Sequence, residues 1–251
     1  MLLELSGLSK RFGGVTAVGG IDLGVQEGQV FGLIGPNGAG KTTLINLIGG
    51  QLRADSGSIR LLGADVTGLP AHRLARLGIA RMFQAIRLFR GLTVLDNVLV
   101  GRHVRTRLDL LATLVPIRGR GVAEYLRALA LLDRIGLRQR AHALAGALAY
   151  GDQRRLEIAR ALASEPRLLI LDEPAAGMNP TESGALRDML RSFVADGLTI
   201  ILIEHDVRLV MGTCERVAVL NFGRKIAEGT PAEIQRDASV REAYLGTDDL
   251  A

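Results

Sequence analysis

The sequence contains very little cysteine, no tryptophan and few lysines among its 251 residues. Its single cysteine, Cys214, excludes an intrachain disulfide bond, and we expect a buried, chemically inactive thiol in a reducing compartment. No stretch of about 18 uninterrupted apolar residues occurs, which excludes a membrane-spanning helix. Near the start, Glu4 stands where a secretion signal needs basic residues and then an apolar core. We therefore expect a globular protein whose contact with any membrane is peripheral.

Aromatic residues are also scarce, at 4% of the chain, although the net charge is +5. A basic protein can bind nucleic acid, but acidic residues are interspersed almost throughout and no aromatic cluster could stack on bases. We therefore expect no nucleic-acid partner. One segment is richer in arginine than in acid; it contains Arg102, Arg105, Arg107, Arg118, Arg120, Arg127, Arg134, Arg138 and Arg140. Two interpretations stay open: a solvated helical face, or a face turned toward anionic lipid or acidic partner loops.

A glycine-rich loop lies between an apolar run at residues 30–34 and a helix-like run at residues 44–48. The loop fits G-x-x-x-x-G-K-[ST], a pattern in which backbone N–H groups and a helix N-terminus surround a phosphate chain. Lys41 would reach the β- and γ-phosphates, and the Thr42 hydroxyl would bind Mg²⁺. We predict a nucleoside triphosphate site formed by Gly35, Pro36, Asn37, Gly38, Ala39, Gly40, Lys41, Thr42 and Thr43.

Apolar patterning predicts an α/β core interrupted by a helical lobe. The predicted elements of the first part are strands at residues 2–5, 15–23, 25–30, 56–62 and 79–84 and a helix at residues 70–77. From about residue 93 to 147, leucine, alanine and arginine recur at helical spacing, with a break at residues 116–121. Within this inserted lobe, the apolar segment 108–115 is either a packed helix or a membrane contact.

Two adjacent carboxylates follow a buried strand in the second half of the chain. Residues 168–171 are continuously apolar, which is typical of a strand covered on both faces of a parallel sheet. Asp172 and Glu173 come next, at the end of the strand where doubly wound folds bind ligands. Beside a phosphate loop, Asp172 would hold Mg²⁺ and Glu173 would take a proton from an attacking water.

Four further residues carry weaker signals. His205 follows an apolar strand at residues 198–204, where it could hydrogen-bond a γ-phosphate, and Gln84 ends another strand. Gly151 lies just ahead of a helix predicted at residues 154–163, a second place for an anion. Phe12 either stacks on a purine or joins the core. The remaining predictions are surface positions for His72, His103 and His142, a hairpin at residues 217–227 and a closing helix at residues 240–245.

Taken in chain order, these signals form a recognisable set. They are residues 35–43, Gln84, residues 148–153, residues 168–173 and His205. In this order they resemble the Walker A, Q-loop, signature, Walker B and switch-histidine motifs of the ATP-binding cassette (ABC) ATPases, over essentially the whole chain. The resemblance implies an α/β P-loop NTPase fold with an N-terminal antiparallel β subdomain and an inserted all-helical subdomain.

The resemblance also implies domain limits, cofactors and roles. The chain would be one domain, 1–251, with its core at 1–84 and about 166–251 and its helical subdomain at about 85–165. Its cofactors would be ATP and Mg²⁺. Catalytic roles would fall to Glu173, His205, Gln84 and Lys41, and metal binding to Thr42, Gln84 and Asp172. Phe12 would stack on adenine, while Gly151 and Gln153 would contact the ATP held by a second cassette.

Finer features are similar to one subgroup, the ATP-binding subunit of bacterial branched-chain amino acid importers. They lie at residues 12–18, 88–98, 175–180, 203–206 and 242–246. The subgroup implies ATP hydrolysis that energises amino acid import from the cytoplasmic face of the inner membrane. Its implied partners are a second ATP-binding cassette, identical or different, two permease subunits and, indirectly, a periplasmic binding protein.

The signature motif departs from the family pattern. Ala149 replaces a serine, Tyr150 a glycine and Asp152 a glutamine, and loss of the serine hydroxyl is worth about 1–3 kcal/mol if nothing replaces it. Asn179 stands where many relatives have aspartate. Alternatives are a cassette for urea or short amides, a soluble ABC ATPase acting on nucleic acid or ribosomes, and a nucleotide-binding regulator without turnover.

Overall fold

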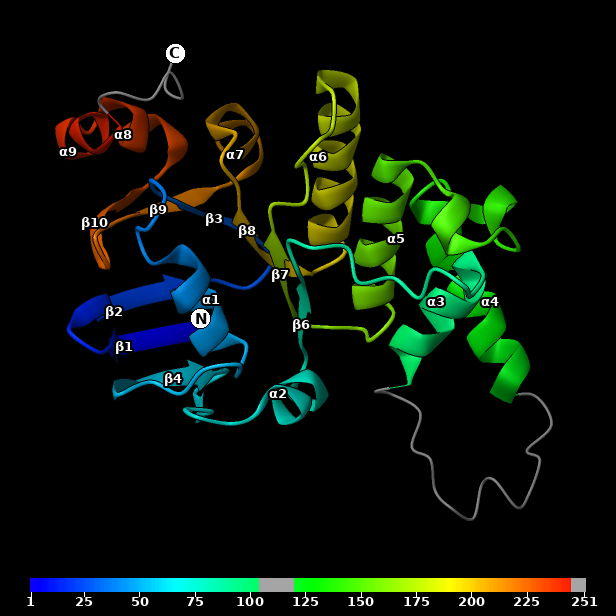
Figure 1. The fold of residues 1–251 in the computed structure, drawn as a ribbon, viewed down its shortest axis with the longest axis horizontal. Helices are drawn as coiled ribbons and strands as arrows, with labels where there is room; N and C mark the ends of the chain where they lie inside the picture. The colour runs from blue at the N-terminus through cyan, green and yellow to red at the C-terminus, as the bar shows by residue number, and fades with distance from the viewer. Residues whose placement is uncertain (104–119, 245–251) are drawn as a thin grey trace.

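The computed structural model describes residues 1–103 and 120–244, in which two sheets enclose one helix and further helices cover the outside (Figure 1). The larger sheet has the strand order β10-β9-β3-β8-β7-β6. Its strands are β3 (Val30–Ile34), β6 (Ile79–Met82), β7 (Leu168–Asp172), β8 (Thr199–Ile203), β9 (Arg216–Asn221) and β10 (Arg224–Gly229). All run parallel except β10, which closes the predicted hairpin with β9. The carboxyl ends of the parallel strands therefore meet along one edge.

Both faces of this sheet are covered, and every residue of β3, β7 and β8 is buried. This burial explains why their sequences are continuously apolar rather than alternating. On one face, α1 (Lys41–Ile48) contributes its apolar residues to a core shared with the smaller sheet. On the other face, the core includes side chains of α6 (Pro180–Ala195) and α7 (Val207–Thr213).

The smaller sheet is antiparallel and has the order β2-β1-β4-β5. It consists of β1 (Leu3–Phe12), β2 (Val15–Val25), β4 (Ser56–Leu61) and β5 (Ala64–Asp65). The strand predicted at residues 25–30 is wrong, because β2 ends at Val25 and a turn follows. In that turn Gly28 has a φ of +68° and donates its N–H to Thr199 Oγ1 at 2.9 Å. The chain thereby leaves the small sheet and enters the large one at Val30.

The helices of the core differ from the prediction mainly at their ends. Besides α1, α6 and α7 they are α2 (Ala71–Leu77), α8 (Pro231–Arg236) and α9 (Ala238–Ala243). The closing helix begins two residues before the predicted start, because the Asp237 side chain accepts hydrogen bonds from the N–H groups of Ser239 and Val240. Neither α6, α7 nor α8 was predicted, although α8 begins with a capping box between Thr230 and Glu233.

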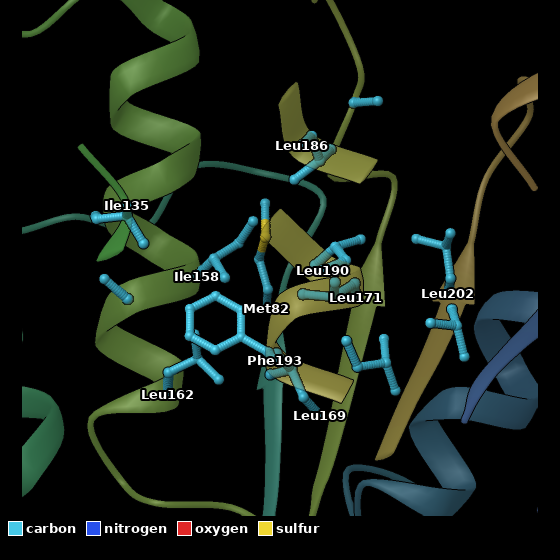
Figure 2. Close-up of a cluster of buried hydrophobic side chains, with 14 of the residues drawn as sticks. Met82, Ile135, Ile158, Leu162, Leu169, Leu171, Leu186, Leu190, Phe193 and Leu202 are labelled. Carbon is cyan, nitrogen blue, oxygen red and sulfur yellow. The ribbon is translucent and has the colours of Figure 1, made fainter. Parts of the chain in front are cut away.

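The predicted helical insertion is confirmed: α3 (Val94–Arg102), α4 (Arg120–Arg134) and α5 (Tyr150–Leu162) lie beside the large sheet (Figure 1). Short 3₁₀ turns, η1 (Arg138–Arg140) and η2 (Ala145–Ala147), join α4 to α5. Figure 2 shows Ile158 and Leu162 of α5 in one cluster with Phe193 of α6 and Leu169 of β7. The insertion therefore shares an apolar core with the α6 face of the sheet.

The arginine-rich segment is not one open face, as the side chain of Arg102 is buried. Its guanidinium pairs with Glu124 and, at 3.2 Å, with Glu165, so assigning Arg102 to an open face was wrong. Arg134 lies 2.6 Å from the Asp196 carboxylate. The predictions for Arg105, Arg107, Arg118 and the apolar segment 108–115 lie outside the described residues. The side chain of Arg120 is not described either.

Other predictions about burial hold. Cys214 is buried, and burial raises the pKa of its thiol above the ordinary value. His72, His103 and His142 are exposed, as predicted. Within residues 1–103 and 120–244, no helix combines the length and the apolar character needed to cross a membrane.

Candidate functional site

The glycine-rich loop connects the carboxyl end of β3 to the N-terminus of α1 at the centre of the sheet edge. Two of its glycines are required by space as well as by conformation. Gly35 and Gly40 have φ values of +150° and +101°, and an added Cβ would come within 2.1 Å of the Leu220 carbonyl oxygen and 2.3 Å of the Ala17 carbonyl oxygen. The loop is therefore held between β2 and β9 in a conformation that only glycine can adopt at these two positions.

Lys41 begins α1 and folds back over the loop. Its Nζ donates to the carbonyl oxygens of Gly35 at 2.6 Å and Pro36 at 3.0 Å. Burial lowers the pKa of Lys41, while the negative charges of Glu173 and Asp172 act in the opposite direction. The ammonium thus lies in the curve of the loop, where a bound phosphate would meet it, and the neighbouring Thr42 is exposed.

Asp172, the last residue of β7, is buried, and its Oδ2 accepts a hydrogen bond from Arg81 at 2.9 Å. Arg81, on the neighbouring strand β6, also donates to Asn46 Oδ1 at 2.5 Å, so it ties the acid to α1. Arg81 was not predicted as a site residue from the sequence. The available signal was a charged residue between apolar neighbours in a buried strand.

Glu173 contacts two other predicted residues from distant parts of the chain. Its Oε1 lies 2.7 Å from His205 Nε2, and its Oε2 accepts a hydrogen bond from Gln84 Nε2 at 2.7 Å. Its backbone has a φ of +52°, an unusual conformation for a residue with a side chain. Strained residues of this kind concentrate at functional sites, where surrounding structure holds them in place.

These residues share one open cavity of ≈ 440 Å³ with the loop. Its walls are residues 37–43, Gln84, Asp172, Glu173, His205, Val15, Thr16, Ala17, Ile203 and Phe222. Phe12 does not line it; half-exposed at the end of β1, its ring has Lys10 Nζ 5.6 Å from the ring centre. A larger cavity, ≈ 660 Å³, is lined by Arg134, Phe193 and Leu198 among others and by none of the predicted site residues.

Gly151 and Gln153 lie away from this cavity, in the first turn of α5. The helix begins at Tyr150, so the predicted start at residue 154 was wrong and Gly151 is inside the helix. Gln153 Nε2 donates to the Leu148 carbonyl oxygen at 2.8 Å. Ala149 occupies the N-cap position and has no side-chain acceptor to offer the first turn.

The two altered polar positions both form contacts within the chain. Asp152 pairs with Arg155 and lies 3.6 Å from an Arg140 nitrogen, so its negative charge is compensated by neighbouring arginines. Asn179 caps α6: its Oδ1 accepts from the Glu182 N–H at 3.0 Å, and Glu182 accepts from the Asn179 N–H at 2.9 Å. Asn179 is therefore an effective helix cap, as aspartate would be.

Glu204 is a buried carboxylate next to the site whose role sequence reasoning missed. It accepts hydrogen bonds from the N–H of Ala175 at 2.7 Å and from its neighbour His205 at 3.3 Å. Burial raises the pKa of Glu204 to about 7; the two N–H donors oppose this, and the carboxylates of Glu173 and Asp206 add to it. Glu204 thereby links the segment after β7 to the segment after β8.

Comparison with known proteins shows what this arrangement is similar to. The sequence profile of the ABC transporter family matches residues 18–176, and that of the branched-chain amino acid ATP-binding cassette transporters matches residues 224–249. Over 249 residues, 98% of both chains, the sequence is 45% identical to the high-affinity branched-chain amino acid transport ATP-binding protein BraF of Pseudomonas aeruginosa.

Two solved structures extend the comparison. The ADP conformation of MJ1267, an ATP-binding cassette of an ABC transporter, superposes with a TM-score of 0.86 at 31% identity over 98% of both chains. The dimeric post-hydrolysis state of the cassette MJ0796, bound to ADP and Pi, gives a TM-score of 0.79 at 25% identity. That match covers 92% of this chain and 99% of the other.

Proposed function

This chain belongs to the ABC transporter family of ATP-binding cassettes, and we propose that it hydrolyses ATP to energise the import of branched-chain amino acids. One observation carries the enzymatic part: Gln84, Glu173 and His205 meet within hydrogen-bonding distance beside the loop that holds Lys41. The substrate rests on the profile match at residues 224–249 and on the full-length similarity to BraF.

The loop and α1 bind the phosphate chain of ATP. Backbone N–H groups of the loop and the helix N-terminus face the phosphates, and Lys41 neutralises charge on the β- and γ-phosphates. The oxygens of Thr42, Gln84 and Asp172 are the hard donors that Mg²⁺ prefers, so these residues would hold it. When bound, the ion supplies further neutralisation of phosphate charge.

Glu173 accepts a proton from the water that attacks the γ-phosphate. Its carboxylate lines the cavity, and the buried strand β7 fixes the position from which it acts. His205 and Gln84 now contact this carboxylate, and a γ-phosphate in the loop gives both side chains an alternative partner. They therefore sense whether the γ-phosphate is present.

A second cassette completes the site. Gly151 and Gln153 do not line the cavity of their own chain, so the N-terminus of α5 is free to face the ATP of a partner. Since Ala149 lacks a hydroxyl, this contact rests on Gly151 and the helix N-terminus. The dimeric structure of MJ0796 supports such pairing.

The pair would work as a peripheral unit on the cytoplasmic face of the inner membrane, with two permeases and, indirectly, a periplasmic binding protein. Residues 1–84 and about 166–251 would form the nucleotide-binding core, and about 85–165 the helical subdomain that carries closure to the permeases. Gln84 stands at the boundary between the two, which suits it to couple γ-phosphate contact to movement of the helices.

Replacing Glu173 by glutamine in the assembled transporter tests the enzymatic proposal. We expect steady-state phosphate release to fall by at least about 100-fold, because the general base is lost while the shape of the site is kept. ATP binding should persist. The matched control is Glu4→Gln, which removes an exposed carboxylate from β1 and should leave turnover unchanged.

An unchanged rate of ATP hydrolysis in Glu173→Gln would contradict the assignment of Glu173 as the base. The substrate is tested separately, by uptake of labelled leucine and of labelled urea in strains with and without this chain. Loss of leucine uptake alone supports the proposal, whereas loss of urea uptake alone contradicts it.

A further inference from the structure

Tyr150, the first residue of α5, stands where the family pattern has glycine. Its side chain is 46% exposed and does not line the cavity that contains Lys41 and Glu173. A contact with the nucleotide of its own chain therefore does not account for it. Since glycine has no side chain, any contact made by this ring or this hydroxyl is a feature of the chain itself rather than of the family pattern.

The hydroxyl of Tyr150 fixes a buried arginine one helical turn further along α5. It accepts hydrogen bonds from Arg154 Nη2 at 2.9 Å and from Arg154 Nε at 3.2 Å. Arg154 is only 3% exposed, and its Nη1 donates to the Phe83 carbonyl oxygen at 3.3 Å. Phe83 directly precedes Gln84, whose amide contacts the Glu173 carboxylate. Through Arg154, the hydroxyl is thus connected to the backbone beside Gln84.

The segment that follows Gln84 is attached to the same helix. Glu157, which is 2% exposed, accepts a hydrogen bond from the Arg87 N–H at 2.5 Å. Its other oxygen lies 3.6 Å from Arg154 Nη1. Arg160 donates to the Arg87 carbonyl oxygen. Because a buried charge is costly without its partner, this arrangement resists separation of α5 from residues 83–87.

The ring of Tyr150 contacts a different segment, the one that leads from Glu173 to α6. A Cβ added at Gly177 would come within 3.1 Å of the ring carbon Cε1, so the ring lies against this glycine. Gly177 has a φ of +77°. The next residue of α5, Gly151, also lies close to this part of the chain, since an added Cβ would come within 3.2 Å of Glu182 Oε1. Tyr150 therefore joins the start of α5 to both segments that contain contacts of the catalytic carboxylate.

We propose that Tyr150 is a positioning residue, which holds the first turn of α5 in a fixed place relative to Gln84 and Glu173 of its own chain. The inference rests on the proposed function, in which Gly151 faces the ATP of a partner cassette. Because Ala149 has no hydroxyl, that contact depends on where the backbone of this turn lies. A displacement of about 1 Å can lower a reaction rate by about 100-fold, so a side chain that fixes the turn contributes to turnover without touching the nucleotide.

The first test is Tyr150→Phe, which keeps the ring against Gly177 and removes the acceptor of Arg154. In the assembled transporter we expect kcat for ATP hydrolysis, expressed per ATP-binding site, to fall by about 10-fold. This is the lower end of the value of one hydrogen bond to a charged group. The ATP affinity of the purified full-length chain should stay unchanged, because Tyr150 does not line its own cavity. The matched control, Tyr125→Phe, removes the hydroxyl of an exposed tyrosine on α4 and should change neither quantity.

The second test concerns the ring. Gly177→Ala places a methyl group against it, and the same substitution in a Tyr150→Gly background meets no ring. The unfavourable φ at residue 177 is common to both backgrounds. We therefore expect Gly177→Ala to lower kcat by a larger factor in the wild type than in Tyr150→Gly.

Three results would overturn the inference. They are an unchanged kcat in Tyr150→Phe, a fall in the ATP affinity of the purified chain as large as the fall in kcat, and an equal effect of Gly177→Ala with and without the ring. The second result would mean that the hydroxyl acts on the nucleotide site of its own chain. If the wild-type transporter did not hydrolyse ATP, the proposed function would be wrong as well, so the two failures are distinct.

Discussion

Replacing Glu204 by glutamine tests whether one buried carboxylate makes the stability of the fold depend on pH. Glu204 is 4% exposed and has a pKa of about 7, whereas an ordinary glutamate titrates at 4.5. Between these values the unfolded chain releases a proton that the folded chain keeps, so the folded state becomes less stable as pH rises. At about 1.4 kcal/mol per pH unit, the unfolding free energy has fallen by about 3 kcal/mol once the pH is above 7.

Glutamine removes the titration but keeps an acceptor for the Ala175 N–H. Relative to the wild type, we expect Glu204→Gln to gain about 3 kcal/mol in unfolding free energy between about pH 4.5 and about pH 8. The lost acceptor for the His205 N–H costs about 1 kcal/mol at every pH, so the change across pH isolates the titration. The assay is urea unfolding followed by circular dichroism, because the chain has no tryptophan.

The matched control is Glu27→Gln, which removes an exposed carboxylate from the turn before β3. The difference in unfolding free energy between Glu27→Gln and the wild type should not rise with pH as it does for Glu204→Gln. A constant difference between Glu204→Gln and the wild type over this pH range would refute the reasoning, since it would mean that the buried carboxylate keeps its ordinary pKa.

Two further predictions concern single contacts. Ala149→Ser should raise the unfolding free energy by about 1 kcal/mol without nucleotide, because serine can cap α5 where alanine cannot; an unchanged urea midpoint would contradict this. Arg81→Met should lower the unfolding free energy by about 3 kcal/mol, because it leaves Asp172 buried without its partner. Asp172→Asn added to Arg81→Met should recover part of that loss, and a double variant no more stable than Arg81→Met would show that the charge is not the cause.

The strands of the large sheet and the glycine loop could be predicted because their signals are local. β3, β7 and β8 are buried on both faces, so each is a short apolar run that can be recognised by itself. Parallel strands have their carboxyl ends at one edge, which is why Asp172 and His205 could be expected near the loop.

Features that depend on strand order or on distant partners could not be predicted in the same way. The contact of Gln84 with Glu173 requires β6 to lie next to β7, an arrangement that neither segment specifies alone. The burial of Arg102 depends on acids 22 and 63 residues further along the chain. The early start of α5 was not predicted because its first turn is polar and lacks apolar residues at helical spacing.

The contacts of Gln84 and His205 with the Glu173 carboxylate link three side chains of the site to one another. Under the proposed mechanism Glu173 is the base, and here its carboxylate is occupied by the two side chains proposed to contact the γ-phosphate, so it is not free to activate water. A nucleotide that lacks the γ-phosphate offers these side chains no replacement partner. Release of the base is thus an exchange of partners that only the triphosphate can complete.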